Sequence, residues 1–187
     1  MSSHHILAFH DEQTIRVYQS YNDQIADEAV LLGTFSQAFK RERMTWVKTS
    51  FLWMMYRSGW ASKEGQRRVL AIDIKRDGFD FIVRNAVPSS FLASGYESHA
   101  AWQQCLKISE ARCQWDPDRD IYGNPLNRRA IQLGIKGELV DRYVMEWITK
   151  ISDITPYVLE IRNAIDDGTF EECMLPTERE YPLLPVI

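Results

Sequence analysis

Short segments with a clear hydrophobic period run along most of the chain. Residues 14–21, TIRVYQSY, alternate Ile15, Val17 and Gln19 with Arg16, Tyr18 and Ser20, which is the period of a β-strand. Residues 68–74, RVLAIDI, form a second and more apolar strand pattern. Helical periods and end signals predict helices near residues 24–32, 51–57, 78–87, 97–108, 137–147 and 156–165, and shorter strands are predicted at 111–115, 129–134 and 148–151.

These elements alternate without a regular βαβ rhythm, so the expected fold class is α+β. We expect a single compact domain over residues 1–187, with a mixed or antiparallel sheet packed by several helices. Residues 1–13 are predicted to be a loose N-terminus. Residues 169–187 end in YPLLPVI and are predicted to be an extended C-terminal arm, because proline is excluded from central strands. Residues 115–129, WDPDRDIYGNPLNRR, have the composition of a loop.

The central segment, residues 41–66, carries three tryptophans spaced seven residues apart: Trp46, Trp53 and Trp60. Seven residues are nearly two helical turns, so one helix would present all three on the same face. Residues 51–56, FLWMMY, are almost entirely apolar, which predicts a helix buried on all sides, capped by Thr45 or Thr49. The segment is therefore either a core helix or one wall of a site for an anionic ligand.

Composition bounds the class of protein without naming it. A chain of 187 residues with 45% hydrophobic and 26% charged residues is long enough to bury a core. The net charge of −4 gives no overall attraction to nucleic acid. Basic residues nevertheless dominate from residue 40 to residue 76, and acidic residues dominate after residue 160. The basic segment either pairs with the acidic tail or meets phosphate.

Several classes of function are disfavoured by missing motifs. The chain has neither a glycine-rich phosphate loop nor a GxSxG elbow, and no His or Cys spacing suits zinc, so no metal is expected. Three widely spaced cysteines, Cys105, Cys113 and Cys173, fit a reducing compartment. Without a signal peptide or a run of about 20 apolar residues, we expect a soluble cytoplasmic protein that does not enter a membrane.

The candidate site combines cations, rings and small polar side chains. Arg and Lys hold phosphate oxygens, aromatic rings stack on flat groups, and Ser or Gln orients a sugar or an amide. The strand residues Arg16 and Tyr18 with Lys48, Ser50 and Gln132 suit a nucleotide-shaped ligand. The further ligand-binding candidates around the central segment are Arg43, Trp53, Arg57 and Arg128. The competing interpretation is that Arg16 and Lys48 pair with the acidic tail while Tyr18 packs in the core.

Four stretches carry a family resemblance: RVYQSYNDQIADEAV, FKRERMTWVKTSFLWMMYRSGWASKEGQ, QWDPDRDIYGNPLNRRAIQLGIKGE and WITKISDITPYV. Together they resemble the domain of unknown function 4291 family, from about Thr14 to Ile165. That family implies no established activity. A remoter similarity to ADP-ribosyltransferase-like folds rests on the order of Arg16-x-Tyr18, Lys48-x-Ser50 and Gln132.

The remoter similarity implies NAD as the ligand and ADP-ribosyl transfer as the reaction. Arg16 and Lys48 would then hold the pyrophosphate, and Ser50 would orient the ribose. Tyr18 or Trp53 would stack on a ring. Gln132 would lie near the scissile bond, with Tyr18 as its catalytic partner. Two other functions stay open: a non-catalytic nucleic-acid-binding module that uses the basic segment, and a structural or interaction domain. The oligomeric state is not predicted.

Overall fold

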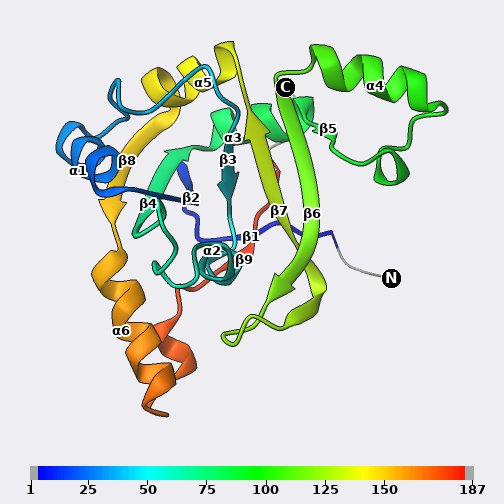
Figure 1. Ribbon diagram of the computed structural model, residues 1–187. Helices are drawn as coiled ribbons and strands as arrows, with labels where there is room; N and C mark the ends of the chain where they lie inside the picture. Colours follow the sequence, from blue (N-terminus) through cyan, green and yellow to red (C-terminus); the bar gives the residue numbers. More distant parts are fainter. Residues whose placement is uncertain (1–3, 184–187) are drawn as a thin grey trace.

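The computed structural model describes residues 4–183, which form an α+β domain around a mixed seven-stranded sheet (Figure 1). The strand order is β5-β6-β7-β3-β2-β4-β8. The strands of this sheet are β2 (Thr14–Tyr21), β3 (Thr45–Lys48), β4 (Arg68–Lys75), β5 (Val87–Pro88), β6 (Ala111–Arg119), β7 (Pro125–Ile135) and β8 (Ile148–Asp153). Only β5 and β6 are parallel neighbours, and the other neighbouring pairs are antiparallel.

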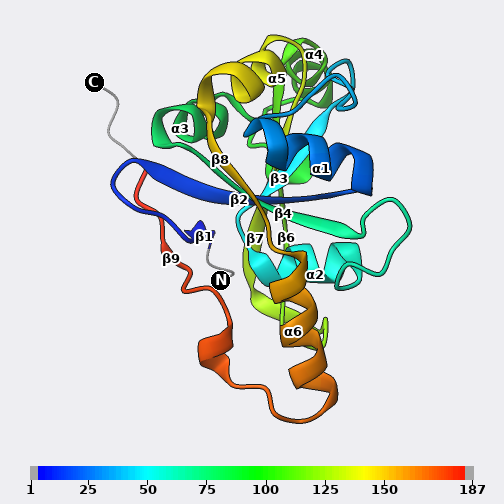
Figure 2. The same cartoon turned by 90° about the vertical axis from the view of Figure 1, so that its left-hand side faces the viewer.

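Helices cover both faces of the sheet. They are α1 (Asp23–Leu32), α2 (Phe51–Ser58), α3 (Arg76–Asn85), α4 (His99–Ile108), α5 (Glu138–Arg142), which continues into a π-helical turn (Tyr143–Trp147), and α6 (Thr155–Asp166). Figure 2 shows α1, α3 and α5 on one side of β2, and α2 and α6 on the other. Short 3₁₀ turns (Phe91–Ala93 and Glu172–Met174) and a two-stranded sheet of β1 (Leu7–Ala8) and β9 (Arg179–Glu180) complete the described chain.

The alternation in β2 separates two hydrophobic cores. Ile15 and Val17 face the larger core, which α1, α3 and α5 cover. Tyr18 faces the smaller core, where α2 and α6 pack through Met54, Met55 and similar apolar residues. Alternate residues of a strand point to opposite faces, so the period-two pattern of residues 14–21 predicted this division correctly. The face that carries Tyr18 also carries its neighbours across the sheet, Lys48 and Gln132.

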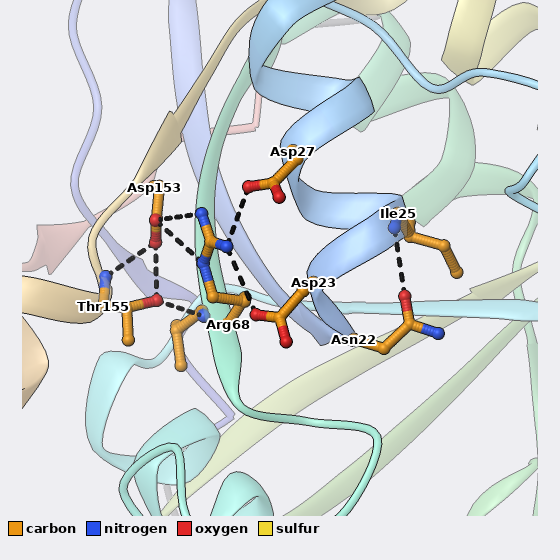
Figure 3. Close-up of polar contacts among 8 residues, drawn as sticks. Asn22, Asp23, Ile25, Asp27, Arg68, Asp153 and Thr155 are labelled. Carbon is orange, nitrogen blue, oxygen red and sulfur yellow. Dashed lines mark hydrogen bonds and ion pairs between the residues drawn. The ribbon is translucent and has the colours of Figure 1, made fainter.

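An ion-pair network joins β4 and the edge strand β8 to the helices α1 and α6 (Figure 3). The Arg68 guanidinium donates to Asp153 at 3.0 and 2.7 Å, and it also pairs with Asp23 and Asp27 of α1. Asp153 in turn accepts from the Thr155 amide at 2.9 Å, at the start of α6. This network fixes α1 and α6 relative to β4. Arg68, one of the cations of the basic segment, therefore has a structural role.

The tryptophan pattern was interpreted wrongly. Trp46 lies on β3, Trp53 lies on α2, and Trp60 follows α2 with a positive φ of 55°. No single helix carries the three rings, because the helix does not start until Phe51 and ends at Gly59 in the left-handed region. Ser50, rather than Thr45 or Thr49, is the N-cap, and its hydroxyl accepts from the Trp53 amide at 3.1 Å.

The Asp- and Pro-rich segment is also not a long loop. It supplies the ends of β6 and β7, and only residues 120–124 form the turn between them. At the chain ends, Leu7–Ala8 pairs with Arg179–Glu180, so residues 7–8 are more ordered than the predicted loose N-terminus. Of the predicted C-terminal arm, residues 184–187 lie outside the described residues, and the preceding part runs from the end of α6 back to β1.

Candidate functional site

Strands β2 and β3 separate soon after they meet, and this separation opens the candidate site. The two strands pair at Tyr18 and Lys48, and the register does not continue toward Tyr21 and Thr45. A side chain bridges the gap instead: Gln19 Nε2 donates to Thr45 Oγ1 at 2.7 Å and to the Trp46 carbonyl at 3.1 Å. The sheet is therefore split between two of its central strands.

A cavity of about 210 Å³ lies at this split, and we call it the β2–β3 cleft. It is lined by Gln19, Ser20, Tyr21, Met44, Thr45, Trp46, Lys48, Met54, Arg57 and Gln66. The lining includes two cations, Lys48 and Arg57, and no carboxylate. Within residues 4–183, neither cation has a carboxylate within ion-pair distance. Within these residues neither cation is therefore held in an ion pair, although Asp116 attracts Lys48 from a greater distance.

Lys48 is the most unusual residue of the cleft because its amine is buried. Its Nζ donates to the Trp46 carbonyl at 3.3 Å and lies 5.6 Å from the centre of the Trp53 ring. The pKa of Lys48 is lowered to about 8, chiefly by burial and secondly by repulsion from Arg57, while Asp116 opposes the shift. An anion placed beside Lys48 and Arg57 would reverse this shift by favouring the charged amine.

A larger cavity of about 570 Å³ adjoins the cleft, and both are lined by Tyr21, Met44 and Thr45. Its own lining adds two more cations, Lys40 and Arg43, and again contains no carboxylate. Trp46, which lies beside this shared boundary, packs over Gly134, where a Cβ atom would come within 2.9 Å of the ring. Cleft and cavity together provide four cations near an aromatic ring, over a volume typical of ligand pockets.

Three of the predicted residues lie in one row across the sheet. Tyr18 pairs with Lys48, and Lys48 pairs with Gln132 on β7, so their side chains share a face. Gln132 donates from Nε2 to Asp116 Oδ2 of the neighbouring strand β6. Tyr18, Lys48 and Gln132 therefore lie side by side on one face of the sheet, and Asp116, which was expected in a loop, lies on β6.

Ser50 and Arg128 meet in a second group, which we call the Asp118 cluster: Ser50, Asp118, Arg128 and Glu178. Asp118 is buried, and its carboxylate accepts from Ser50 Oγ at 2.7 Å and from Arg128 Nε at 2.8 Å. Ser50 thus serves as the helix cap and as a partner of Asp118. The cluster adjoins the row of Tyr18, Lys48 and Gln132 because Ser50 follows Lys48 by two residues.

Glu178 of the C-terminal arm was missed by the sequence analysis. Its Oε1 accepts from the Phe51 amide, the first of α2, at 2.6 Å. Burial of the carboxyl group raises the pKa of Glu178 to about 8, and the charge of Asp118 adds to the shift, while the Phe51 amide and Arg128 oppose it. The acidic tail therefore does reach the candidate site, through Glu178, and no local sequence pattern predicts this contact.

The raised pKa of Glu178 predicts a pH-dependent stability. The folded protein holds this proton up to about pH 8, whereas the unfolded chain loses it near 4.5, so the free energy of unfolding should fall as the pH rises between these values. Replacing Glu178 with Gln should flatten this fall by roughly 4 kcal/mol over the window. Urea unfolding of the parent protein and of Glu178→Gln from pH 5 to pH 8.5 measures this difference. Parallel plots of unfolding free energy against pH would contradict the prediction.

Arg16 is held away from the cleft by its own ion pair. Its guanidinium donates from Nε and NH2 to the two oxygens of Asp73, at 2.7 and 2.9 Å, on the neighbouring strand. Arg16 therefore pairs within the sheet, and among residues 4–183 Lys48 pairs with no carboxylate. Arg57 and Arg43, and not Arg16, line the two cavities.

Residues 4–183 contain neither a cluster of metal-ligating side chains nor a helix able to span a membrane. No group of three or more His, Cys, Asp or Glu side chains is arranged to hold a metal ion. None of the helices in that range combines the length and the apolar character that crossing a bilayer requires. The three cysteines are free thiols.

Fold and site define an α+β protein with a split sheet and a cation-lined cleft at the split. A family model described as a domain of unknown function, DUF4291, matches residues 5–181, and the chain belongs to this family. No curated protein and no solved structure matches the chain. The family resemblance seen in the sequence motifs is thereby confirmed.

Proposed function

We propose that the protein binds a nucleotide through its phosphate groups in the β2–β3 cleft. The observation that carries the proposal is that Lys48 and Arg57 line one cavity with no carboxylate among its lining residues. Uncompensated cations in a partly buried cavity favour an anion, and Arg and Lys are the usual ligands of phosphate. Lys40 and Arg43 extend this charge into the adjoining cavity, which has room for a sugar and a base.

NAD is the nucleotide that we propose first, with ADP-ribosyl transfer as the reaction. In this proposal Lys48, Arg57 and Arg43 hold the pyrophosphate, and Trp46 or Trp53 lies against a ring. Gln132 lies in the same row as Lys48, where its amide can orient the ribose next to the phosphates, whereas Tyr18 is buried and lines neither cavity. Transfer would break the bond between the ribose and nicotinamide, pass the ribose to an acceptor nucleophile, and release nicotinamide and a proton. We place this activity in the cytoplasm, since free thiols suit a reducing compartment.

Thermal unfolding in the presence of nucleotides tests the proposal. With a Kd of about 50 µM, ADP or NAD at about 1 mM would stabilise the fold by about 1.8 kcal/mol. For a chain of this size, that corresponds to a rise in Tm of about 5 °C. Adenosine, which lacks the phosphates, should leave the Tm unchanged. Equal shifts with adenosine and ADP, or no shift with either ADP or NAD, would overturn the proposal.

Nucleic acid is the second candidate, and the exposed cations Lys40 and Arg43 at the open end of the site favour it. A strand of RNA would place successive phosphates along the same cations, and each phosphate neutralised would steepen the fall of affinity with salt. Fluorescence anisotropy with a labelled oligonucleotide at several salt concentrations decides this. Absence of binding at low salt would exclude it.

A further inference from the structure

The N-terminus of α2 carries a second polar centre, distinct from the β2–β3 cleft. The Phe51 amide is the first of α2, so no carbonyl within the helix can accept its hydrogen bond. It donates instead to Glu178 Oε1 at 2.6 Å. Glu178 comes from the C-terminal arm, 127 positions away in the sequence. Figure 2 shows this arm running from the end of α6 past α2 to β9. A carboxyl group of the same chain therefore caps the N-terminus of α2.

A buried hydroxyl without a partner lies at the same place. Tyr18 is only 1% exposed, and its hydroxyl makes no hydrogen bond with any described residue. The Tyr18 ring packs edge-on against Phe51, with ring centres 5.7 Å apart. Burial raises the pKa of Tyr18, and among the neighbouring charged groups Glu178 contributes most to the shift. A buried polar group is normally paired, so this hydroxyl indicates a site built for one more partner.

An open cavity adjoins the helix end. It measures about 290 Å³ and lies between α2 and the arm, with Phe51, Leu52, Arg128, Thr177 and Glu178 among its lining residues. The arm is attached on both sides of Glu178: the Met174 carbonyl accepts from the Tyr157 hydroxyl, and the buried Tyr181 hydroxyl donates to Asp80 at 2.7 Å. Glu178 can therefore leave the helix end by rotating its side chain, without detachment of the arm.

We propose that the Phe51 amide, the Tyr18 hydroxyl and the Arg128 guanidinium form a binding site for a carboxyl group. Glu178 occupies this site as an internal ligand bound, within the described residues, by the Phe51 amide alone, which leaves the Tyr18 hydroxyl unpaired, and a small carboxylic acid that enters the 290 Å³ cavity takes its place. The ligand class is a monocarboxylic acid with a short chain, because the cavity wall is completed by apolar side chains such as Leu52 and Leu175. This inference does not depend on nucleotide binding in the β2–β3 cleft.

Charged groups from several elements face the carboxyl group. Asp118 of β6 disfavours its negative charge, whereas Arg128 of β7 and the Phe51 amide favour it, and Tyr18 of β2 is close enough to interact with it electrostatically. Burial outweighs the favourable contacts, so the site accepts the protonated acid more readily than the carboxylate. Binding of an external acid should therefore tighten as the pH falls.

Rescue of Glu178→Ala by acetate tests the inference. The substitution empties the site, so about 50 mM acetate at pH 6 should raise the Tm of Glu178→Ala by about 3 °C. The same acetate should leave the parent protein and Glu178→Gln unchanged, because a side chain already fills their sites. Sodium chloride at equal ionic strength is the salt control, and Tyr18→Phe added to Glu178→Ala should reduce the rescue.

Two results would overturn the inference. One is a Tm of Glu178→Ala that acetate does not change, and the other is an equal shift in all three proteins. Should Glu178→Ala not fold, Glu178→Ser takes its place in the same titration, since a serine leaves the carboxyl position empty while keeping a polar side chain there.

Discussion

Replacing Lys48 with Met is expected to weaken ADP binding by about 100-fold while making the fold more stable. The lost contact is a charge-assisted one between the amine and a phosphate, which contributes about 2.7 kcal/mol. The gain in stability has a different origin. Lys48 is buried, and its pKa is lowered from 10.5 to about 8, so the folded state disfavours the charged amine.

The sign of the pH dependence follows from this shift. Between about pH 8 and 10.5 the unfolded chain holds the Lys48 proton and the folded protein does not, so the free energy of unfolding rises with pH in this window. Below pH 8 the folded protein bears a penalty of roughly 2 to 3 kcal/mol, which Lys48→Met removes. Urea unfolding and calorimetric titration with ADP measure the two effects separately.

The matched control for Lys48→Met is Lys150→Met. Lys150 is exposed on β8 at the edge of the sheet, outside both cavities. Its replacement should change neither ADP affinity nor stability by more than about 0.5 kcal/mol. Unchanged ADP affinity in Lys48→Met would show that the buried amine is a feature of the core and not a ligand contact.

Replacing Asp118 with Ala is expected to destabilise the protein by about 3 kcal/mol and to lower the Tm by about 10 °C. Asp118 is 2% exposed and accepts from Ser50 Oγ, the Arg119 amide and Arg128 Nε. Its loss leaves these donors without their acceptor beside the start of α2, and buried donors without partners are costly.

Thermal and urea unfolding of Asp118→Ala check this prediction. Asp166→Asn is its control, because Asp166 forms an exposed ion pair with Arg162 on α6. Exposed pairs of this kind contribute little, so that variant should stay within about 0.5 kcal/mol of the parent. An Asp118→Ala variant as stable as Asp166→Asn would mean that the Asp118 cluster does not hold α2 in place.

Strands β2 and β4 could be predicted from the sequence because the hydrophobic pattern of each strand is local. Alternation in residues 14–21 and the apolar run in 68–74 need no distant partner to be recognised. The alternation also put Tyr18 and Arg16 on one face, which the structure confirms. Family membership was likewise predictable, since it rests on motifs that span most of the chain.

Other features could not be predicted because they depend on where the chain turns. A spacing of seven residues can arise within one helix, or between a strand and the helix that follows it. The spacing alone therefore could not show that Trp46 lies on a strand and Trp53 on a helix. In residues 115–119 the alternation of Asp116 and Asp118 was hidden by a composition typical of loops. Glu178 meets Phe51 only through the tertiary fold, and nothing in its neighbourhood marks that contact.

We propose that Lys48 is a buried cation, without an ion pair among residues 4–183, that receives a phosphate group of the nucleotide. NMR titration of ¹³C-labelled lysine side chains, with Lys48→Met to assign the signal, measures the pKa of Lys48 with and without saturating ADP. We expect a pKa of about 8 in the free protein and a rise of at least about one unit with ADP, because a nearby phosphate favours the charged amine. A Lys48 that titrates near 10.5 in the free protein, or whose pKa does not change with ADP, would contradict the account.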